Sequence, residues 1–188
     1  PDYYTPMEET ASALEMAVRS GRTRYVGVSN YPAWAAVHMA DLLGSAIGMA
    51  GVQTEYSLLN RSAEQELIPA AQELGFGIMG WSALGRGVLT GKYRNATPPD
   101  SRGASVHLAG FVAPYLNDDA ARVVNAVATA AAGLERSPLE VALAWARGSD
   151  GIDCSIVGAR NTHQLRDILA AADLQLEPQI RHVLNEVS

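Results

Sequence analysis

A glycine-rich loop with basic and aromatic residues is the part of the sequence whose residue types best suit ligand binding. It follows an apolar run, residues 76–79, that is typical of a buried strand. Glycines let the backbone approach a ligand closely, while Arg86 and Lys92 supply the charge and hydrogen-bond donors that suit phosphate. Trp81 offers a flat face on which a planar ring can stack. Because the same residues equally fit a core tryptophan beside turn-forming glycines, the surrounding elements must decide between the two interpretations.

The composition indicates one globular domain, residues 1–188, with no nucleic-acid partner and no metal site. The chain has 188 residues, of which 48% are hydrophobic, enough to bury a sizeable core. A formal net charge of −6 without a basic stripe opposes binding to nucleic acid, because that binding requires neutralisation of phosphates. The 4 histidines are scattered without the spacing of metal ligands.

Cysteine usage and hydropathy favour a cytoplasmic protein. The single cysteine, Cys154, has no partner for a disulfide, which suits a reducing compartment. No apolar run approaches the length that spans a bilayer, and the first residues do not resemble a signal peptide. We therefore expect a cytoplasmic protein with no membrane partner.

Helical and strand patterns alternate along the first part of the chain. A capping box at residues 5–8 predicts a helix that ends near Gly21, and helices are also expected after residues 30–32 and from residues 62–65. Strands are predicted at residues 24–29, 49–56 and 76–81, with Val26, Val52 and Ile78 at matching points. Strands joined by single helices usually run parallel, so the predicted class is α/β.

The second part of the chain continues the alternation after an irregular excursion. Residues 93–114 are rich in Pro, Gly, Ser and Arg, as in functional or mobile loops. Three further helices are expected to begin at caps: Asn117, Ser137, and Asn161 with Gln164. A strand is expected at residues 153–157 and a closing helix at residues 178–187. The periodicity predicts that the helices bury Trp34, Val37, Leu42, Leu43, Leu67, Ala71, Leu74, Leu165, Ile168 and Leu169.

Candidate ligand-binding residues lie at the C-terminal end of each predicted parallel strand. They are Ser29 with Asn30, Gln53, Trp81 with the glycine-rich loop, and the segment 158–160. Ligands of α/β folds bind at the carboxyl ends of the strands, so these residues predict one shared site.

Several segments carry a resemblance to a known family that covers the whole chain in order. They are GRTRYVGVSN at 21–30, VQTEYSLLNR at 52–61, GWSAL at 80–84, LTGKY at 89–93 and GAR at 158–160. With these segments the sequence resembles the aldo-keto reductases, (β/α)8 barrels that use NADPH to reduce carbonyls, and especially the branch of the potassium-channel β subunits. The resemblance implies NADP(H) as cofactor and a small-molecule carbonyl compound as substrate.

The resemblance also implies a role for each matching residue. Ser29, Asn30 and Gln53 would hydrogen-bond the nicotinamide carboxamide, and Trp81 would stack on the nicotinamide ring. The loop over the pyrophosphate would consist of Ser82, Ala83, Leu84, Gly85, Arg86 and Lys92, with Arg102 helping to clamp the cofactor. The adenine and 2′-phosphate end would consist of Gly158, Arg160, Gln164 and Asp167. Two positions depart from the family pattern, because Ala83 replaces a common proline and Ile168 replaces an asparagine that often meets adenine.

The family's catalytic Asp, Tyr, Lys and His lie upstream of the region that this chain resembles, so we expect no catalytic residue here. The predicted fold is accordingly the C-terminal half of a (β/α)8 TIM barrel, with parallel strands and extra C-terminal helices and without the family's N-terminal half. Such a half would expose two strand edges, which favours pairing with the missing N-terminal half or self-association. Two alternatives to the reductase stay open: a non-catalytic nucleotide-binding or regulatory module, and an inactive fragment.

Overall fold

A four-stranded parallel sheet organises the chain in the computed structural model, which describes residues 1–2 and 4–188. The strand order is β1-β2-β3-β4, and all neighbouring strands run parallel. The strands are β1 (Gly27–Ser29), β2 (Gly51–Glu55), β3 (Gly77–Trp81) and β4 (Cys154–Ile156). This arrangement confirms the predicted α/β class and the four predicted strands, each of which is shorter than expected.

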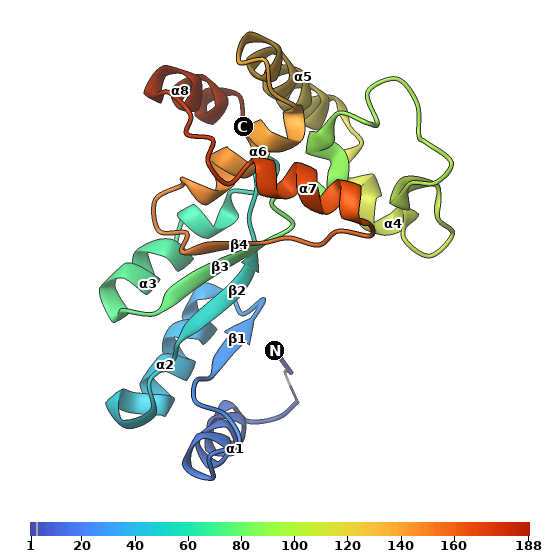
Figure 1. Cartoon of the computed structure of the whole chain (residues 1–188). Coiled ribbons are helices and arrows are strands. Elements are labelled where there is room, and N and C mark those ends of the chain that lie inside the picture. The colour runs from blue at the N-terminus through green and yellow to red at the C-terminus, as the bar shows by residue number, and fades with distance from the viewer. Residues whose placement is uncertain (3) are drawn as a thin grey trace.

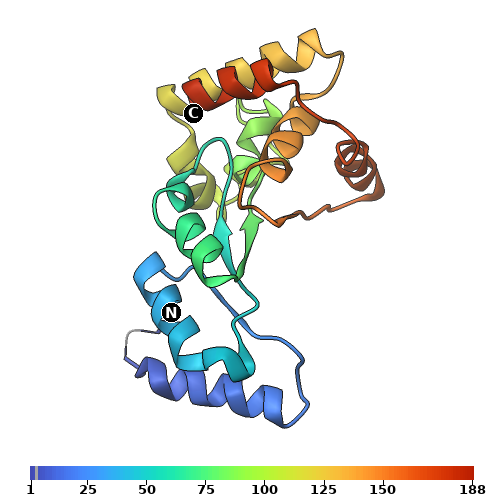
Figure 2. The same ribbon diagram turned by 90° about the vertical axis from the view of Figure 1, so that its left-hand side faces the viewer.

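Helices lie between and beyond the strands (Figure 1). They are α1 (Met7–Arg19), α2 (Ala33–Ile47), α3 (Leu67–Leu74), α4 (Ala109–Val112), α5 (Asp118–Gly133), α6 (Pro138–Arg147), α7 (Thr162–Ala170) and α8 (Pro178–Val187). Short 3-10 turns are η1 (Ser62–Glu64), η2 (Gly85–Thr90), η3 (Arg102–Ala104) and η4 (Ala113–Tyr115). Figure 2 shows α1 and α2 at the opposite end of the molecule from α5 and α8.

The helix caps follow the sequence at some sites and not at others. The Asn117 side chain caps α5, and Ser137 forms a capping box at α6, both as predicted. The capping box predicted at Thr5 does not form, because α1 has Pro6 and not Thr5 as its N-cap; the Thr5 hydroxyl donates to an Asp2 carboxylate oxygen at 2.6 Å. Ser62 does not cap α3 either, since it begins the separate turn η1.

The strand register confirms one predicted match and corrects another. Val52 lies opposite Ile78 as predicted, but the partner of Val52 on β1 is Val28 and not Val26. The observed register places Gly27 beside Gly51, where a Cβ atom on Gly27 would meet the Gly51 carbonyl oxygen. The backbones approach closely because glycine occupies this position.

The helices turn different faces inward from those that the periodicity predicted. The buried face of α2 consists of Ala35, Ala36, Met39 and Leu43, small or flexible residues that let the helix pack closely. Trp34, which was expected in the core, is 63% exposed. Leu43, Leu67, Ala71 and Ile168 are buried as predicted, and Leu42 packs partly buried against the core, whereas Val37, Leu74, Leu165 and Leu169 are exposed.

The excursion, residues 93–114, contains only the short elements η3 and α4 and the start of η4. Its lack of long regular structure agrees with the irregular sequence of residues 93–114. Within the described residues, none of the helices combines the length and the apolarity that crossing a membrane requires.

Candidate functional site

A pocket of about 430 Å³ lies where β3 and β4 end, and we call it the glycine-loop pocket. The predicted site residues that line it are Trp81, Ser82, Ala83, Leu84, Arg86, Lys92, Arg102, Gly158, Arg160 and Gln164. The lining is completed by Gly87, Thr90, Leu139, Ile156, Val157 and Ile168. Residues from β3, the loop after it, the excursion and the start of α7 therefore meet in one place, although they are far apart in the sequence.

Five predicted residues do not line this pocket, and three of them, Ser29, Asn30 and Gln53, lie at the ends of β1 and β2. Ser29 is the register partner of Gln53, and the Asn30 backbone N–H donates to the Gln53 carbonyl at 2.8 Å. The Asn30 side chain accepts a hydrogen bond of 2.9 Å from the indole Nε1–H of Trp81. Asn30 therefore connects Ser29 and Gln53 to the tryptophan and restrains the orientation of the indole.

Several residues of the loop after β3 have a left-handed backbone conformation. Ser82 and Arg86 have φ values of 56° and 57°, in the left-handed region, and Gly85 has a φ of 54°. A hydrogen bond of 2.7 Å from the Gly85 N–H to the Ser82 carbonyl closes the turn. Gly85 itself is buried beneath Leu59 and does not line the pocket. Its role is to let the loop pack against the segment that follows β2.

The sequence suggested that Arg86 is free to donate hydrogen bonds to a phosphate, but in the structure its side chain is bound to other residues of the protein. Its Nε and Nη2 atoms donate to the two carboxylate oxygens of Glu55, at 2.8 and 2.6 Å. Its Nη1 atom donates to the Phe111 carbonyl at 2.6 Å. The hydrogen bonds to Glu55 raise the pKa of the Arg86 guanidinium above its usual value. Sequence analysis missed Glu55 as part of this site, although a carboxylate at the end of a buried strand requires a partner.

The other cations of the pocket are exposed and have no acidic partner. Among the described residues, no carboxylate forms an ion pair with Lys92, Arg102 or Arg160. The Lys92 ammonium lies 5.2 Å from the centroid of the Tyr93 ring. The Arg160 Nη1 atom donates to the Asp100 carbonyl of the excursion at 3.3 Å. These charges are available to an anionic ligand.

The start of α7 is organised by side chains that were predicted to cap it. Asn161 accepts a hydrogen bond of 2.9 Å from the Gln164 backbone, and the Gln164 side chain accepts one of 2.9 Å from the Arg160 backbone. Asp167 does not line the pocket and instead lies 3.5 Å from the His163 imidazole on the same helix. The arrangement fixes the backbone of Arg160 at the N-terminal end of α7, where the helix dipole favours anions.

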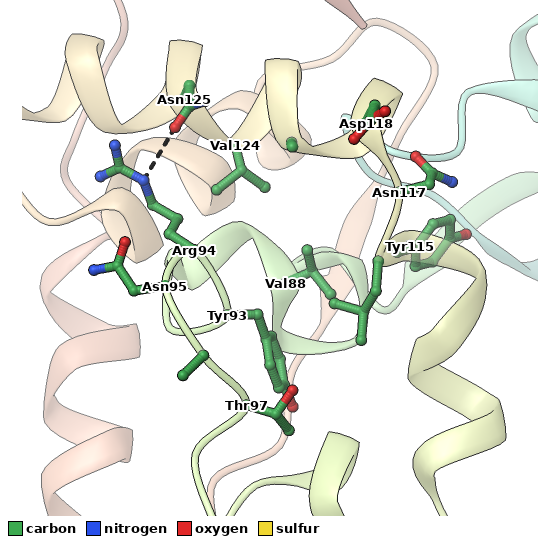
Figure 3. Close-up of a pocket in the computed structure, with 13 residues that line it drawn as sticks. Val88, Tyr93, Arg94, Asn95, Thr97, Tyr115, Asn117, Asp118, Val124 and Asn125 are labelled. Carbon is green, nitrogen blue, oxygen red and sulfur yellow. Dashed lines mark hydrogen bonds between the residues drawn. The ribbon is translucent and has the colours of Figure 1, made fainter.

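A second pocket, also of about 430 Å³, lies between the excursion and α5 (Figure 3). Val88 and Val124 form its apolar part, and the Arg94 Nε atom donates to the Asn125 side chain at 3.1 Å. None of the predicted site residues lines it. The contact anchors the start of the excursion to α5.

Among the residues that the structure describes, no group of three or more His, Cys, Asp or Glu side chains could hold a metal ion. Cys154 is exposed on β4 and is not paired.

Comparisons with known proteins match the sequence of this chain to one family. The chain matches the sequence model of the Aldo/keto reductase family over residues 1–187. It is 31% identical to the uncharacterized oxidoreductase YrpG of Bacillus subtilis (strain 168), over 99% of this chain and 55% of that protein. It is 33% identical to a probable voltage-gated potassium channel subunit beta of Oryza sativa subsp. japonica, over 93% of this chain and 54% of that protein. It is 36% identical to the L-glyceraldehyde 3-phosphate reductase of Escherichia coli (strain K12), over 90% of this chain and 50% of that protein. The chain thus spans about half the length of the curated relatives it matches.

Proposed function

Because the chain belongs to the aldo/keto reductase family, we propose that it binds NADP(H) in the glycine-loop pocket and serves the reduction of an aldehyde or ketone carbonyl to an alcohol. The observation that carries the proposal is that three cations with no ion-pair partner among the described residues, Lys92, Arg102 and Arg160, line one pocket together with Trp81. Cations suit the phosphates of a dinucleotide and an indole suits its planar ring, so the residues fit the cofactor.

The phosphate end of the cofactor would lie near β4 and α7. Arg160 is held at the N-terminal end of α7 by Gln164, so its guanidinium and the helix dipole would both favour the 2′-phosphate. Lys92 and Arg102 would meet the pyrophosphate from the loop and the excursion. We therefore propose a preference for NADPH over NADH.

The nicotinamide end would lie at Trp81. The hydrogen bond from the indole to Asn30 restrains the ring, which favours stacking in one orientation. The polar side chains of Ser29, Asn30 and Gln53 lie at the ends of the neighbouring strands, where they would meet the carboxamide. When bound, NADPH supplies a hydride to the carbonyl carbon of the substrate.

We further propose that this chain supplies the cofactor-binding half of a (β/α)8 barrel and that the proton donor belongs to the other half. The support is that four parallel strands pair in sequence order and that the relatives are about twice as long as this chain. The other half could belong to the same polypeptide or to a second one. Tyr56 does not serve as the donor in this proposal, because its hydroxyl donates to Glu64 at 2.7 Å and its ring packs on Trp145.

The test compares the affinities for NADPH and NADH by isothermal titration calorimetry. We expect tighter binding of NADPH, and an Arg160→Ala variant that loses about tenfold in affinity for NADPH and little for NADH, the size of one charge-assisted contact. Arg166→Ala is the matched control, since Arg166 is an exposed arginine on α7, the helix that follows Arg160, and does not line the pocket. Equal affinities for both nucleotides, or an unchanged preference in Arg160→Ala, would refute the assignment.

Turnover decides between the reductase and its alternatives. Oxidation of NADPH by a panel of aldehydes and ketones, followed at the absorbance of the reduced nicotinamide, is the expected result for the protein with both barrel halves. Nucleotide binding without turnover of any carbonyl compound would instead favour a regulatory module. Aggregation and the absence of nucleotide binding would favour an inactive fragment.

A further inference from the structure

The Arg86 side chain lies between a carboxylate and a group of aromatic rings. Glu55 holds its guanidinium through two hydrogen bonds, and both side chains are largely buried, with 16% of Arg86 and 10% of Glu55 exposed. The guanidinium carbon lies 4.2 Å from the centroid of Phe111, 4.9 Å from Tyr115 and 6.0 Å from Trp81. These distances are typical of cation–π contacts.

Phe111 completes the group by stacking on Trp81. The two ring centroids lie 6.4 Å apart, and the ring planes are inclined by 15°. Trp81 lines the glycine-loop pocket and Phe111 does not, so the contact leaves the pocket side of the indole free. Arg86 also binds the Phe111 carbonyl, which fixes the backbone of α4 as well as its ring.

The geometry makes Arg86 a poor phosphate ligand. Three of the five N–H donors of its guanidinium are already bound to Glu55 and to the Phe111 carbonyl, and moving the guanidinium away from Glu55 would leave that carboxylate buried without a partner. The charge of Arg86 is also neutralised by Glu55 at hydrogen-bond distance, so the pair adds little positive potential to the pocket. The positive potential comes from Lys92, Arg102 and Arg160.

We propose that Arg86 and Glu55 are positioning residues, which hold Phe111 against Trp81 and so set the indole for stacking on the nicotinamide ring, and that Arg86 does not bind phosphate. The inference rests on the proposed function and changes the role of Arg86 within it. Under this proposal the pocket has two ends: a ring end that depends on the Glu55–Arg86 pair, and a phosphate end that depends on Lys92, Arg102 and Arg160.

The effect of Glu55→Gln on the affinity for NADPH distinguishes a phosphate-binding role of Arg86 from a positioning role, because the two roles predict opposite changes. If Arg86 bound phosphate, removal of the neighbouring negative charge would strengthen NADPH binding. In the positioning role the same change weakens one of the two bonds that hold Arg86, so the affinity for NADPH falls about fivefold to tenfold, the size of one aromatic stacking contact. Arg86→Lys keeps the charge but cannot make the two-pronged contact, and we expect a similar loss.

A fragment of the cofactor separates the two ends of the pocket. The probe is 2′,5′-ADP, which has the adenosine phosphates and no nicotinamide ring. We expect Glu55→Gln and Arg86→Lys to change its affinity less than about twofold, whereas Arg160→Ala lowers it about tenfold. Stronger NADPH binding by Glu55→Gln, or a loss of 2′,5′-ADP affinity in Arg86→Lys equal to its loss for NADPH, would overturn the proposal.

A measurement on the ligand-free protein tests the positioning role of Arg86 and Glu55 independently of nucleotide binding. The near-ultraviolet circular dichroism of Trp81, obtained by subtracting the spectrum of Trp81→Phe, should change in both Glu55→Gln and Arg86→Lys, while far-ultraviolet spectra show that the fold is kept. An unchanged Trp81 signal would overturn the positioning role. A changed signal in a protein that binds neither NADPH nor 2′,5′-ADP would leave the positioning role standing and remove the proposed function.

Discussion

Replacing Gly85 by alanine should distort the loop of the glycine-loop pocket, because two separate penalties meet at this position. Gly85 has a φ of 54°, a left-handed conformation that costs an alanine about 1–2 kcal/mol. An added Cβ atom would also lie 2.7 Å from Leu59 Cδ1 and 3.3 Å from Leu89 Cγ. Such crowding forces neighbouring side chains to shift, at a typical cost of about 1–3 kcal/mol. The two penalties together predict a loss of about 2–5 kcal/mol in the free energy of unfolding.

Gly21→Ala is the matched control for the backbone penalty. Gly21 also has a positive φ, of 75°, but no atom lies within 4 Å of the position of an added Cβ atom. Its replacement should therefore cost only the backbone term, about 1–2 kcal/mol. The difference between the two variants, about 1–3 kcal/mol, measures the crowding beneath the loop.

Urea unfolding of both variants, followed by circular dichroism, measures these costs. A double variant with Leu59→Ala tests the cause, since removal of the Leu59 methyl groups should make Gly85→Ala less costly than it is in the wild-type background. Equal losses for Gly85→Ala and Gly21→Ala, or additive losses in the double variant, would refute the reasoning. We also expect Gly85→Ala to weaken NADPH binding, because the displaced loop carries pocket residues.

The remaining predictions concern caps and pH. Ser137→Ala and Asn117→Ala should each lower the free energy of unfolding by about 1 kcal/mol, since each side chain caps a helix. Thr5→Ala removes no cap and should lower the free energy of unfolding clearly less in the same urea experiment. Hydrogen bonds from Arg61 hold the pKa of Glu64 below its usual value. The carboxylate therefore stabilises the fold above the unfolded-state pKa of about 4.5, and this stabilisation is lost as the pH falls through the lower folded-state pKa. Glu64→Gln should be less stable than the wild type at pH 7, with a difference that shrinks towards pH 3; a difference that does not depend on pH would contradict this account.

The sequence alone determined the features that depend on neighbouring residues. The caps at Asn117 and Ser137 form as predicted because each side chain bonds a backbone N–H only three residues away. The parallel α/β arrangement was also predictable, since a helical crossover returns the chain in the same direction. Most of the predicted site residues meet in one pocket because they follow strands whose carboxyl ends share one edge of the sheet.

The tertiary structure alone decided which partners the charged and aromatic side chains find. Arg86 meets Glu55, 31 residues earlier in the chain, and Phe111, 25 residues later, because the loop after β3 packs against the segment that follows β2 while α4 packs on the loop. Trp34 is exposed because the alanines of α2 allow a closer approach than the tryptophan would. Short stretches of sequence determine helical periodicity and local hydrogen bonds, whereas the partner of a buried charge depends on contacts between distant segments. The sequence therefore predicted most of the residues that line the glycine-loop pocket but not Glu55, whereas the fold paired Arg86 with Glu55 and left Arg160 without a carboxylate partner among the described residues.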